Sequence, residues 1–359
     1  MVHLHTFKDN INISEISRLL KEREDFLPLM EYYSKEVAPN LFFQPENSKK
    51  IKELRINNAI KNLLFLNEFK LLVESFNNDD INLILLKGLA MEPYYPDGLR
   101  TFSDIDILVH KKDLKKIDLV MGKLGYSQNN EPREGAINVR KNIGYTKKKG
   151  RNLLVECHFL LGPTPYLDRL QPKTLFREAG SVKFGDVETL VLSLEDTLIN
   201  LALHIFSHIP DPCIVSICDI RQLILHNEKD INWDILISKT VKYKLAMPMR
   251  FAFNRVLEVF DIPVISSVLD KLKNIRISKR EELILSLLEN PNRKVANLGK
   301  LLFGFRTIRK VQLIIYILFP SRKYIQERFK VGDSKFLFLY YFKNIKENVI
   351  MALSWFLGE

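Results

Sequence analysis

The feature that most constrains the fold is a pair of aspartates one residue apart inside the apolar segment TFSDIDILV, residues 101–109. Its aliphatic content predicts a buried strand. Because side chains alternate along a strand, Asp104 and Asp106 share one face, while Ile105 and Ile107 point into the core. Unpaired buried carboxylates are costly to desolvate. A bound divalent cation therefore explains the pair better than a purely structural role.

The neighbouring segments predict a small α/β domain around this strand. Residues 81–88, INLILLKG, form a β-rich run that ends at Gly88, and a short helical stretch over 89–95 is stopped by the turn PDG. Residues 111–126 predict an amphipathic helix with Gly125 as its C-terminal stop. The segments NIGYTKK (142–148) and NLLVECHFLL (152–161) predict a hairpin around KKGRN.

Helical periodicity flanks this domain on both sides. Apolar residues recur at helical spacing from about residue 11 to 80, and the chain after about Ser193 is helical in pattern. The predicted fold class is α+β, a small mixed sheet with an N-terminal helical segment and a large C-terminal helical domain. The expected boundaries are 1–80, 81–190 and 191–359, and the last unit includes a basic, aromatic C-terminal segment.

A third carboxylate, Glu156, lies on the second strand of the predicted hairpin, with Leu154 and His158 on its side. Three carboxylates on adjacent strands can form a two-metal site in which Asp104 and Asp106 bridge both cations. Glu156 then holds only the cation that activates the attacking oxygen. The alternative is that Glu156 pairs with Arg140 or Arg151 across the hairpin.

Composition excludes several classes of protein. The net charge of +11 and pI of about 9.3 favour an anionic ligand, but lysines scattered among carboxylates do not form a nucleic-acid-binding stripe. Three cysteines without CxxC spacing indicate neither a disulfide framework nor a zinc site. The first residues lack the pattern of a signal peptide, and VQLIIYILFP is too short to span a membrane. A cytoplasmic protein is expected.

The segment LLKGLAMEPYYPDGLRTFSDIDILV resembles the core motif of the DNA polymerase beta-like nucleotidyltransferase superfamily. More narrowly, it is similar to the bacterial uncharacterised nucleotidyltransferase family, whose members show K-G, then Y-P, then R-x-x-x-D-x-D. VECHF resembles the Glu/Asp-x-His strand of that family, and LHIFSH, DIRQLI and INWDIL resemble its helical signatures. The similarity covers most of residues 80–262 and implies a polymerase beta-like fold.

The resemblance implies transfer of a nucleoside monophosphate from a nucleoside triphosphate (NTP) to an unidentified acceptor, with release of pyrophosphate. Two Mg²⁺ or Mn²⁺ ions would be held by Asp104, Asp106 and Glu156, which are the expected catalytic residues. The turn after the first strand resembles the phosphate-holding turn of these enzymes, with Gly88 allowing close approach. The residues expected to bind the nucleotide are Lys87, Gly88, Arg100 and Ser103.

Polar residues outside the metal set suggest an acceptor side. His204 and His208 lie four residues apart on one predicted helical face, which is compatible with zinc, but no third ligand is evident. A buried or hydrogen-bonded role, with Asp219 as one partner, is the preferred interpretation. His158 lines the cleft beside Glu156 or ends the strand. The acceptor-side candidates are His158, His204, His208 and Asp219.

Two other functions stay open. Lys87-Gly88 stands where the superfamily usually has Gly-Gly or Gly-Ser, which suits a non-catalytic nucleotide-binding scaffold or sensor in a biosynthetic assembly. A toxin-type nucleotidyltransferase acting on RNA or protein would suit the basic charge. The favoured acceptor classes are a small molecule and a glycan or peptide intermediate, and RNA or protein is a less favoured acceptor. The C-terminal segment, with Trp355 and Phe356, either packs on the helical domain or meets a membrane peripherally.

Overall fold

The structure is a computed structural model that describes residues 24–37, 48–129, 141–149, 151–163, 166–184, 186–209, 214–288, 319–320, 322–332 and 337–357. Its strands are β1 (Leu83–Leu85), β2 (Asp104–Val109), β3 (Ser127–Gln128), β4 (Asn142–Lys149), β5 (Arg151–His158), β6 (Gly180–Phe184) and β7 (Val187–Val191). The helices that precede β6 in the sequence are η2 (Glu24–Phe26), α2 (Leu27–Val37), α3 (Ser48–Asn78), η4 (Gly88–Tyr94), η5 (Lys111–Asp113), α4 (Leu114–Lys123) and α5 (Pro172–Glu178). The later helices are α6 (Leu194–Ser207), α7 (Ile214–Asn227), α8 (Trp233–Lys242), α9 (Ala246–Val259), α10 (Pro263–Lys273), α11 (Lys279–Leu288), α14 (Arg322–Phe329) and α15 (Leu337–Leu357).

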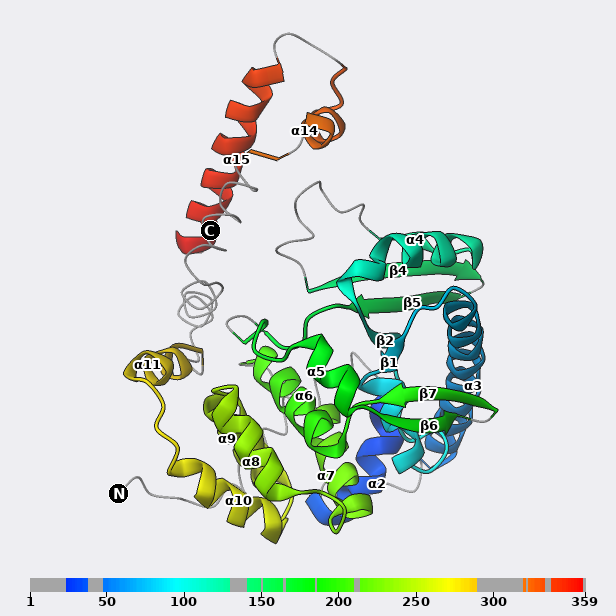
Figure 1. Ribbon diagram of the computed structural model, residues 1–359, viewed down its shortest axis with the longest axis vertical. Helices are drawn as coiled ribbons and strands as arrows, with labels where there is room; N and C mark the ends of the chain where they lie inside the picture. The colour runs from blue at the N-terminus through cyan, green and yellow to red at the C-terminus, as the bar shows by residue number, and fades with distance from the viewer. Residues whose placement is uncertain are drawn as a thin grey trace.

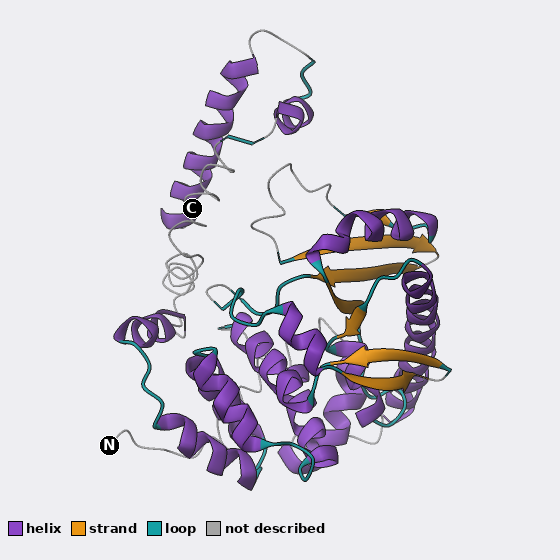
Figure 2. Cartoon of the chain, in the orientation of Figure 1, coloured by secondary structure: helices purple, strands orange, loops and turns teal. Residues whose placement is uncertain are grey.

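The strands form one mixed sheet in the order β3-β4-β5-β2-β1-β7-β6. β2 runs antiparallel to β1 and parallel to β5, and β4 and β5 form the hairpin that the sequence predicts. The pair β6 and β7 was not predicted; β7 extends the sheet by pairing parallel to β1. These findings confirm the α+β class with a mixed sheet, and Figure 2 shows the strands lying among the helices.

The two faces of the sheet pack on different helices. On one face, Ile105 and Ile107 belong to a hydrophobic core with aromatic and aliphatic residues of α3 and with residues of α4. On the other face, Ile84 and Leu108 belong to a core built mainly from α6, α7, α9 and α10. Figure 1 shows α3 on one side of the central strands and α6 to α10 on the other. The even-numbered residues of β2, including both aspartates, therefore face the helical side.

The described part of the chain after Ser193 is helical, as its pattern predicts. Helices α8 and α9 are separated by a turn in which Lys244 has a φ of 53°. Cys157 and Cys218 are buried free thiols, while Cys213 lies outside the described residues.

The C-terminal segment is described in part. Arg328 of α14 donates to Asn344 of α15 at 2.6 Å and pairs with Glu347 at 2.8 Å, so these two helices are joined by polar contacts. Among the described helices, none has the length and apolar character needed to cross a bilayer. Residues 289–318, and the side chains of Trp355 and Phe356, lie outside what the structure describes, so peripheral membrane contact stays a prediction.

Candidate functional site

The acidic face of β2 meets the acidic face of β5 at the centre of the sheet. The parallel register places Asp106 beside Glu156 and Leu108 beside His158, and Asp104 lies one pleat before Asp106. Asp106 is buried, while Asp104 and Glu156 are half-buried. The sequence expectation that the three carboxylates share one face is therefore confirmed, because alternation on two paired strands leaves no other arrangement.

Within the described part of the chain, one group of side chains has the geometry to hold a metal ion. Asp106, Glu156 and His158 each offer a ligand atom, and these atoms all lie within 4.8 Å of one another. His158 Nε2 lies 2.7 Å from Asp106 Oδ1 and 3.3 Å from Glu156 Oε2. The sequence assigned His158 to the acceptor side, whereas the structure places it among the metal-capable groups. Asp104 lies outside this group of three.

Electrostatics keep the central carboxylate charged. Burial alone would raise the pKa of Asp106, but the Lys87 ammonium and the hydrogen bond from His158 hold it well below its usual range. His158 lowers the pKa of Glu156 through its hydrogen bond. For Asp104 the balance is opposite, since burial and the neighbouring Asp106 raise its pKa. The site thus concentrates negative charge on Asp106 and Glu156, as cation binding requires.

Lys87 lies at the end of β1, where its ammonium donates to Asp106 Oδ2 at 2.7 Å. Burial lowers the pKa of Lys87, but attraction to Asp106 outweighs that effect and raises it. Gly88 has a φ of 69°, a backbone conformation that residues with a side chain rarely adopt, so the turn requires glycine. The lysine of this turn pairs with a metal-capable carboxylate, and the binding of a phosphate by the turn stays a prediction.

Two residues that the sequence reasoning missed also reach the site. Asn142 donates from Nδ2 to Glu156 Oε2 at 2.7 Å. Lys141 lies close enough for burial and the charge of Lys87 to lower its pKa. The hairpin register could have found Asn142, since β4 places it opposite His158 and on the same face. Lys141 precedes the strand, and no alternation rule places it.

His208 caps the C-terminal end of α6, and the helix itself carries His204 one turn earlier. Burial, Lys87 and His208 together lower its pKa well below the usual value. The rings of His204 and His208 meet edge to face with centroids 4.6 Å apart. The proposed partner Asp219 is engaged elsewhere, with Arg100 and Tyr95. The structure therefore brings His204 toward the site and leaves Asp219 in a separate network.

The depressed pKa of His204 predicts a pH effect on stability. Below the unfolded-state pKa of about 6.5, this histidine binds a proton in the unfolded chain but not in the folded chain. The free energy of unfolding therefore decreases as the pH is lowered, by up to about 1.4 kcal/mol per pH unit. His204→Asn should flatten urea-unfolding stability between pH 7 and 5 relative to the wild type. His158 contributes with the opposite sign in both proteins, because its pKa is raised. An unchanged slope in the variant would contradict the prediction.

Arg100 and Asp219 form a buried connection between the segment before β2 and helix α7. Arg100 Nε and Nη2 donate to Asp219 Oδ1 and Oδ2 at 2.9 and 3.0 Å, and the hydroxyl of Tyr95 donates to Oδ1 at 2.9 Å. Asp219 is fully buried and Arg100 is 8% exposed. The nucleotide-binding role of Arg100 stays a prediction, beside this structural contact. Ser103 is exposed, with its hydroxyl 3.4 Å from Asp104 Oδ1.

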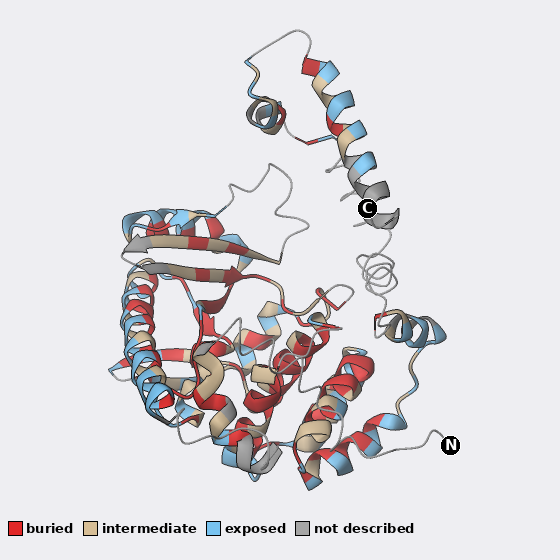
Figure 3. Ribbon diagram, turned by 180° about the vertical axis from the view of Figure 1, so that it is seen from behind, coloured by how far each residue is buried: buried red, intermediate tan, exposed pale blue. Residues whose placement is uncertain are grey.

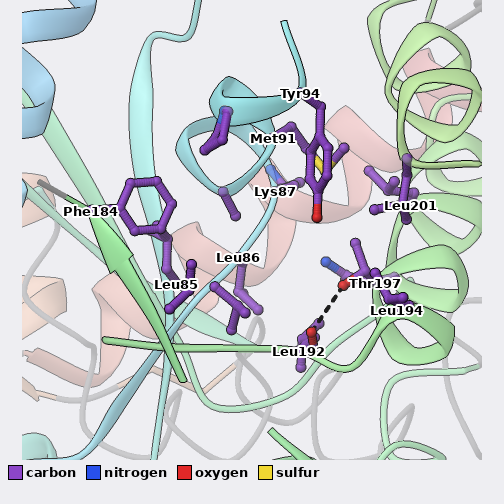
Figure 4. Close-up of a pocket in the computed structure, with 16 residues that line it drawn as sticks. Leu85, Leu86, Lys87, Met91, Tyr94, Phe184, Leu192, Leu194, Thr197 and Leu201 are labelled. Carbon is purple, nitrogen blue, oxygen red and sulfur yellow. Dashed lines mark hydrogen bonds between the residues drawn. The ribbon is translucent and has the colours of Figure 1, made fainter. Parts of the chain in front are cut away.

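A cavity of about 180 Å³ lies beside Lys87, between the sheet and the helical side. Figure 4 shows Met91 and Tyr94 of η4, Phe184 of β6 and Leu201 of α6 around it. Its lining is mainly apolar, and buried Asn200 of α6 also lines it. The side chain of Lys87 therefore contributes to both the cavity wall and the acidic cluster.

The comparison with protein families assigns the class of this protein. The model of the uncharacterised nucleotidyltransferase family matches residues 22–261, about two thirds of the chain. The chain belongs to this family, and thereby to the transferases. No curated protein matches the chain.

Several solved structures are similar in fold. The antibiotic-resistance factor ANT(2'')-Ia is 14% identical and matches over 54% of this chain and 95% of its own, with a TM-score of 0.36. The lincosamide antibiotic adenylyltransferase LnuA, bound to lincomycin, is 14% identical over 48% and 97%, with a TM-score of 0.31. An antigenic nucleotidyltransferase-like protein from Paracoccidioides brasiliensis is 12% identical over 57% and 92%, with a TM-score of 0.36.

Proposed function

We propose that this protein is a Mg²⁺-dependent nucleotidyltransferase that moves a nucleoside monophosphate from an NTP to an acceptor and releases pyrophosphate. The observation that carries the proposal is the group Asp106, Glu156 and His158, with ligand atoms within 4.8 Å of one another and a lysine on Asp106. A buried carboxylate that pairs with an ammonium and an imidazole is suited to bind a divalent cation. Membership of the family supports the same reaction class.

The donor set of the site fits a divalent cation. Carboxylate oxygens suit Mg²⁺ and Mn²⁺, and the imidazole of His158 adds a ligand that Mn²⁺ accepts more readily. Asp106, Glu156 and His158 would hold one ion, and Asp104 would complete a second position beside Asp106. When bound, such ions neutralise charge on the phosphoryl group in transfer. The identity of the ion, Mg²⁺ or Mn²⁺, and the presence of two ions are parts of this proposal.

The other residues of the site position the substrates. Once Asp106 is shared with a cation, the ammonium of Lys87 is available to a phosphate oxygen of the NTP, and Ser103 offers a hydroxyl at the exposed edge. An acceptor oxygen attacks the α-phosphorus in line, the bond to the bridging oxygen breaks, and pyrophosphate leaves with its electron pair. The apolar cavity beside Lys87 supports a substrate with an apolar group, held by α6 and η4.

A second candidate is a non-catalytic nucleotide-binding scaffold. The contact that favours it is the 2.7 Å ion pair between Lys87 and Asp106, because an ammonium held there competes with a metal for the same oxygen. This candidate predicts NTP binding without release of pyrophosphate.

The experiment that tests the proposal measures thermal stability with each NTP, with and without Mg²⁺ or Mn²⁺. A ligand that binds only the folded state raises the melting temperature, by an amount set by its concentration relative to its Kd. A shift that needs both metal and one NTP is expected. Labelled NTP is then followed in cell extracts: label from the α-phosphate should move to an acceptor, while label from the γ-phosphate appears in pyrophosphate. Binding without transfer would favour the scaffold, and no shift with any NTP would overturn both.

A further inference from the structure

Helix α3 has an exposed apolar stripe on the side that faces away from the sheet. Its buried side packs into the core through Phe65, Phe69, Leu72, Val73 and Phe76. The opposite side carries Ile56, Ile60, Leu63, Leu64 and Leu71, each between 46% and 60% exposed. Figure 3 shows buried and exposed residues dividing this helix lengthwise. Five large aliphatic side chains along one exposed helix face form a surface that a partner can cover.

The spacing of the stripe is symmetric about its centre. With Asn67, which is also exposed, the positions are 56, 60, 63, 64, 67 and 71, so the intervals are four, three, one, three and four. Steps of three and four residues keep side chains on one helix face. Because the order of intervals is the same in both directions, an antiparallel copy of the helix presents the same pattern in register.

We propose that α3 is the interface of a symmetric dimer in which two copies of this chain pair their α3 helices antiparallel. A two-fold axis between residues 63 and 64 places Ile56 opposite Leu71 and Leu63 opposite Leu64 of the second copy. Ile60 then faces Asn67, and a polar residue within such a seam fixes register at some cost in stability. Each copy uses the same residues, as two-fold symmetry requires.

The charges at the ends of α3 favour the antiparallel arrangement. Exposed Lys49, Lys50, Lys52 and Arg55 lie in its N-terminal part with one exposed acid, Glu53, and exposed Glu74 lies near its C-terminal end with Asp80 just beyond. In the antiparallel pair, the mainly basic N-terminal part of one copy lies beside the acidic C-terminal end of the other, although the same axis sets Glu53 opposite Glu74. A parallel pair would instead place Lys49 and Lys52 beside the same lysines of the second copy, where like charges repel.

This interface is independent of the proposed transfer site. α3 covers the face of the sheet that carries Ile105 and Ile107, whereas Asp106 and Glu156 are on the opposite face. A dimer through α3 leaves both metal-capable clusters uncovered. Variants of the stripe should therefore change the association state without changing metal or nucleotide binding.

The test is sedimentation equilibrium of the full chain. The wild type is expected to sediment at twice the 42.0 kDa chain mass. The double variant Leu63→Glu with Leu64→Glu should weaken the dimer by at least about 100-fold in Kd, because two apolar side chains at its centre become charged. The matched control is Leu119→Glu on α4, which changes a leucine that is 69% exposed outside the stripe and should leave the dimer intact.

A charge exchange tests the orientation. Lys52→Glu alone should weaken the dimer by a few-fold, and adding Glu74→Lys should restore it, since residues 52 and 74 then carry opposite charges again. A monomeric wild type at tens of micromolar would overturn the proposal, as would a dimer that survives the two leucine changes. The proposal would also be overturned by a monomer that sediments with anionic phospholipid vesicles and loses this binding when Leu63 and Leu64 are replaced, because the stripe would then bind a membrane. Failure of the double exchange to restore the dimer would overturn the antiparallel geometry.

Discussion

Asp106→Asn is expected to abolish nucleotidyl transfer and to lower Mn²⁺ affinity by at least about 100-fold. Asp106 contacts both Lys87 and His158 and lies beside Glu156, so removing its charge affects every group in the cluster. Asparagine keeps the shape of the side chain but replaces one charged oxygen with a donor that cannot bind a cation. Isothermal titration with Mn²⁺ measures the first effect, and transfer from α-labelled NTP measures the second.

Asp196→Asn is the matched control for this substitution. Asp196 is a buried carboxylate paired with Lys239 at 2.8 Å, so its replacement removes the same chemistry outside the metal-capable group. This variant should lose stability but keep wild-type metal affinity. Full metal affinity or retained transfer in Asp106→Asn would refute the assigned site, provided that circular dichroism shows both variants folded.

Asp219→Ala is expected to destabilise the protein by about 3–5 kcal/mol. The substitution leaves the Arg100 guanidinium buried without its counter-charge and removes the acceptor of the Tyr95 hydroxyl. The same contacts join the segment before β2 to α7, so their loss should also loosen the attachment of the helical side to the sheet. Urea unfolding at pH 7 measures the change, with the midpoint and slope fitted separately.

Glu258→Ala is the control, because Glu258 pairs with Arg255 at 2.8 Å in a more exposed position and should change stability by no more than about 1 kcal/mol. Replacing both members, Arg100→Met with Asp219→Leu, should recover part of the loss, since no buried charge remains unpaired. A loss below about 1 kcal/mol for Asp219→Ala would show that the network carries little of the folding energy.

Local rules were sufficient for the central part of the sheet. Alternation along β2 predicted that Asp104 and Asp106 share a face, and the turn chemistry of KKGRN predicted the β4–β5 hairpin. Strands β6 and β7 were not predicted, and the pairing of β7 with β1 joins residues more than a hundred positions apart in the sequence, Ile84 with Leu190. Local propensity carries no signal for such a distant partner.

The candidate site shows the same division. The carboxylates were predicted because alternation along one strand determines which of its side chains share a face. The residues that pair with those carboxylates were not predicted. The contact of Lys87 with Asp106 and the contact of Asp219 with Arg100 were not predicted. Both pairings depend on how β1 and α7 approach β2, which no single segment encodes.

The sequence by itself determined the family, the mixed α+β class and the acidic face of β2, because motif spacing and strand alternation are properties of one continuous segment. Only the tertiary structure decided that His158 joins Asp106 and Glu156, that Lys141 reaches the cluster, and that α3 leaves an apolar stripe exposed. The physical reason is that burial and charge pairing depend on distances between separate elements. Those distances are set by packing on both faces of the sheet, not by the order of residues along any one element.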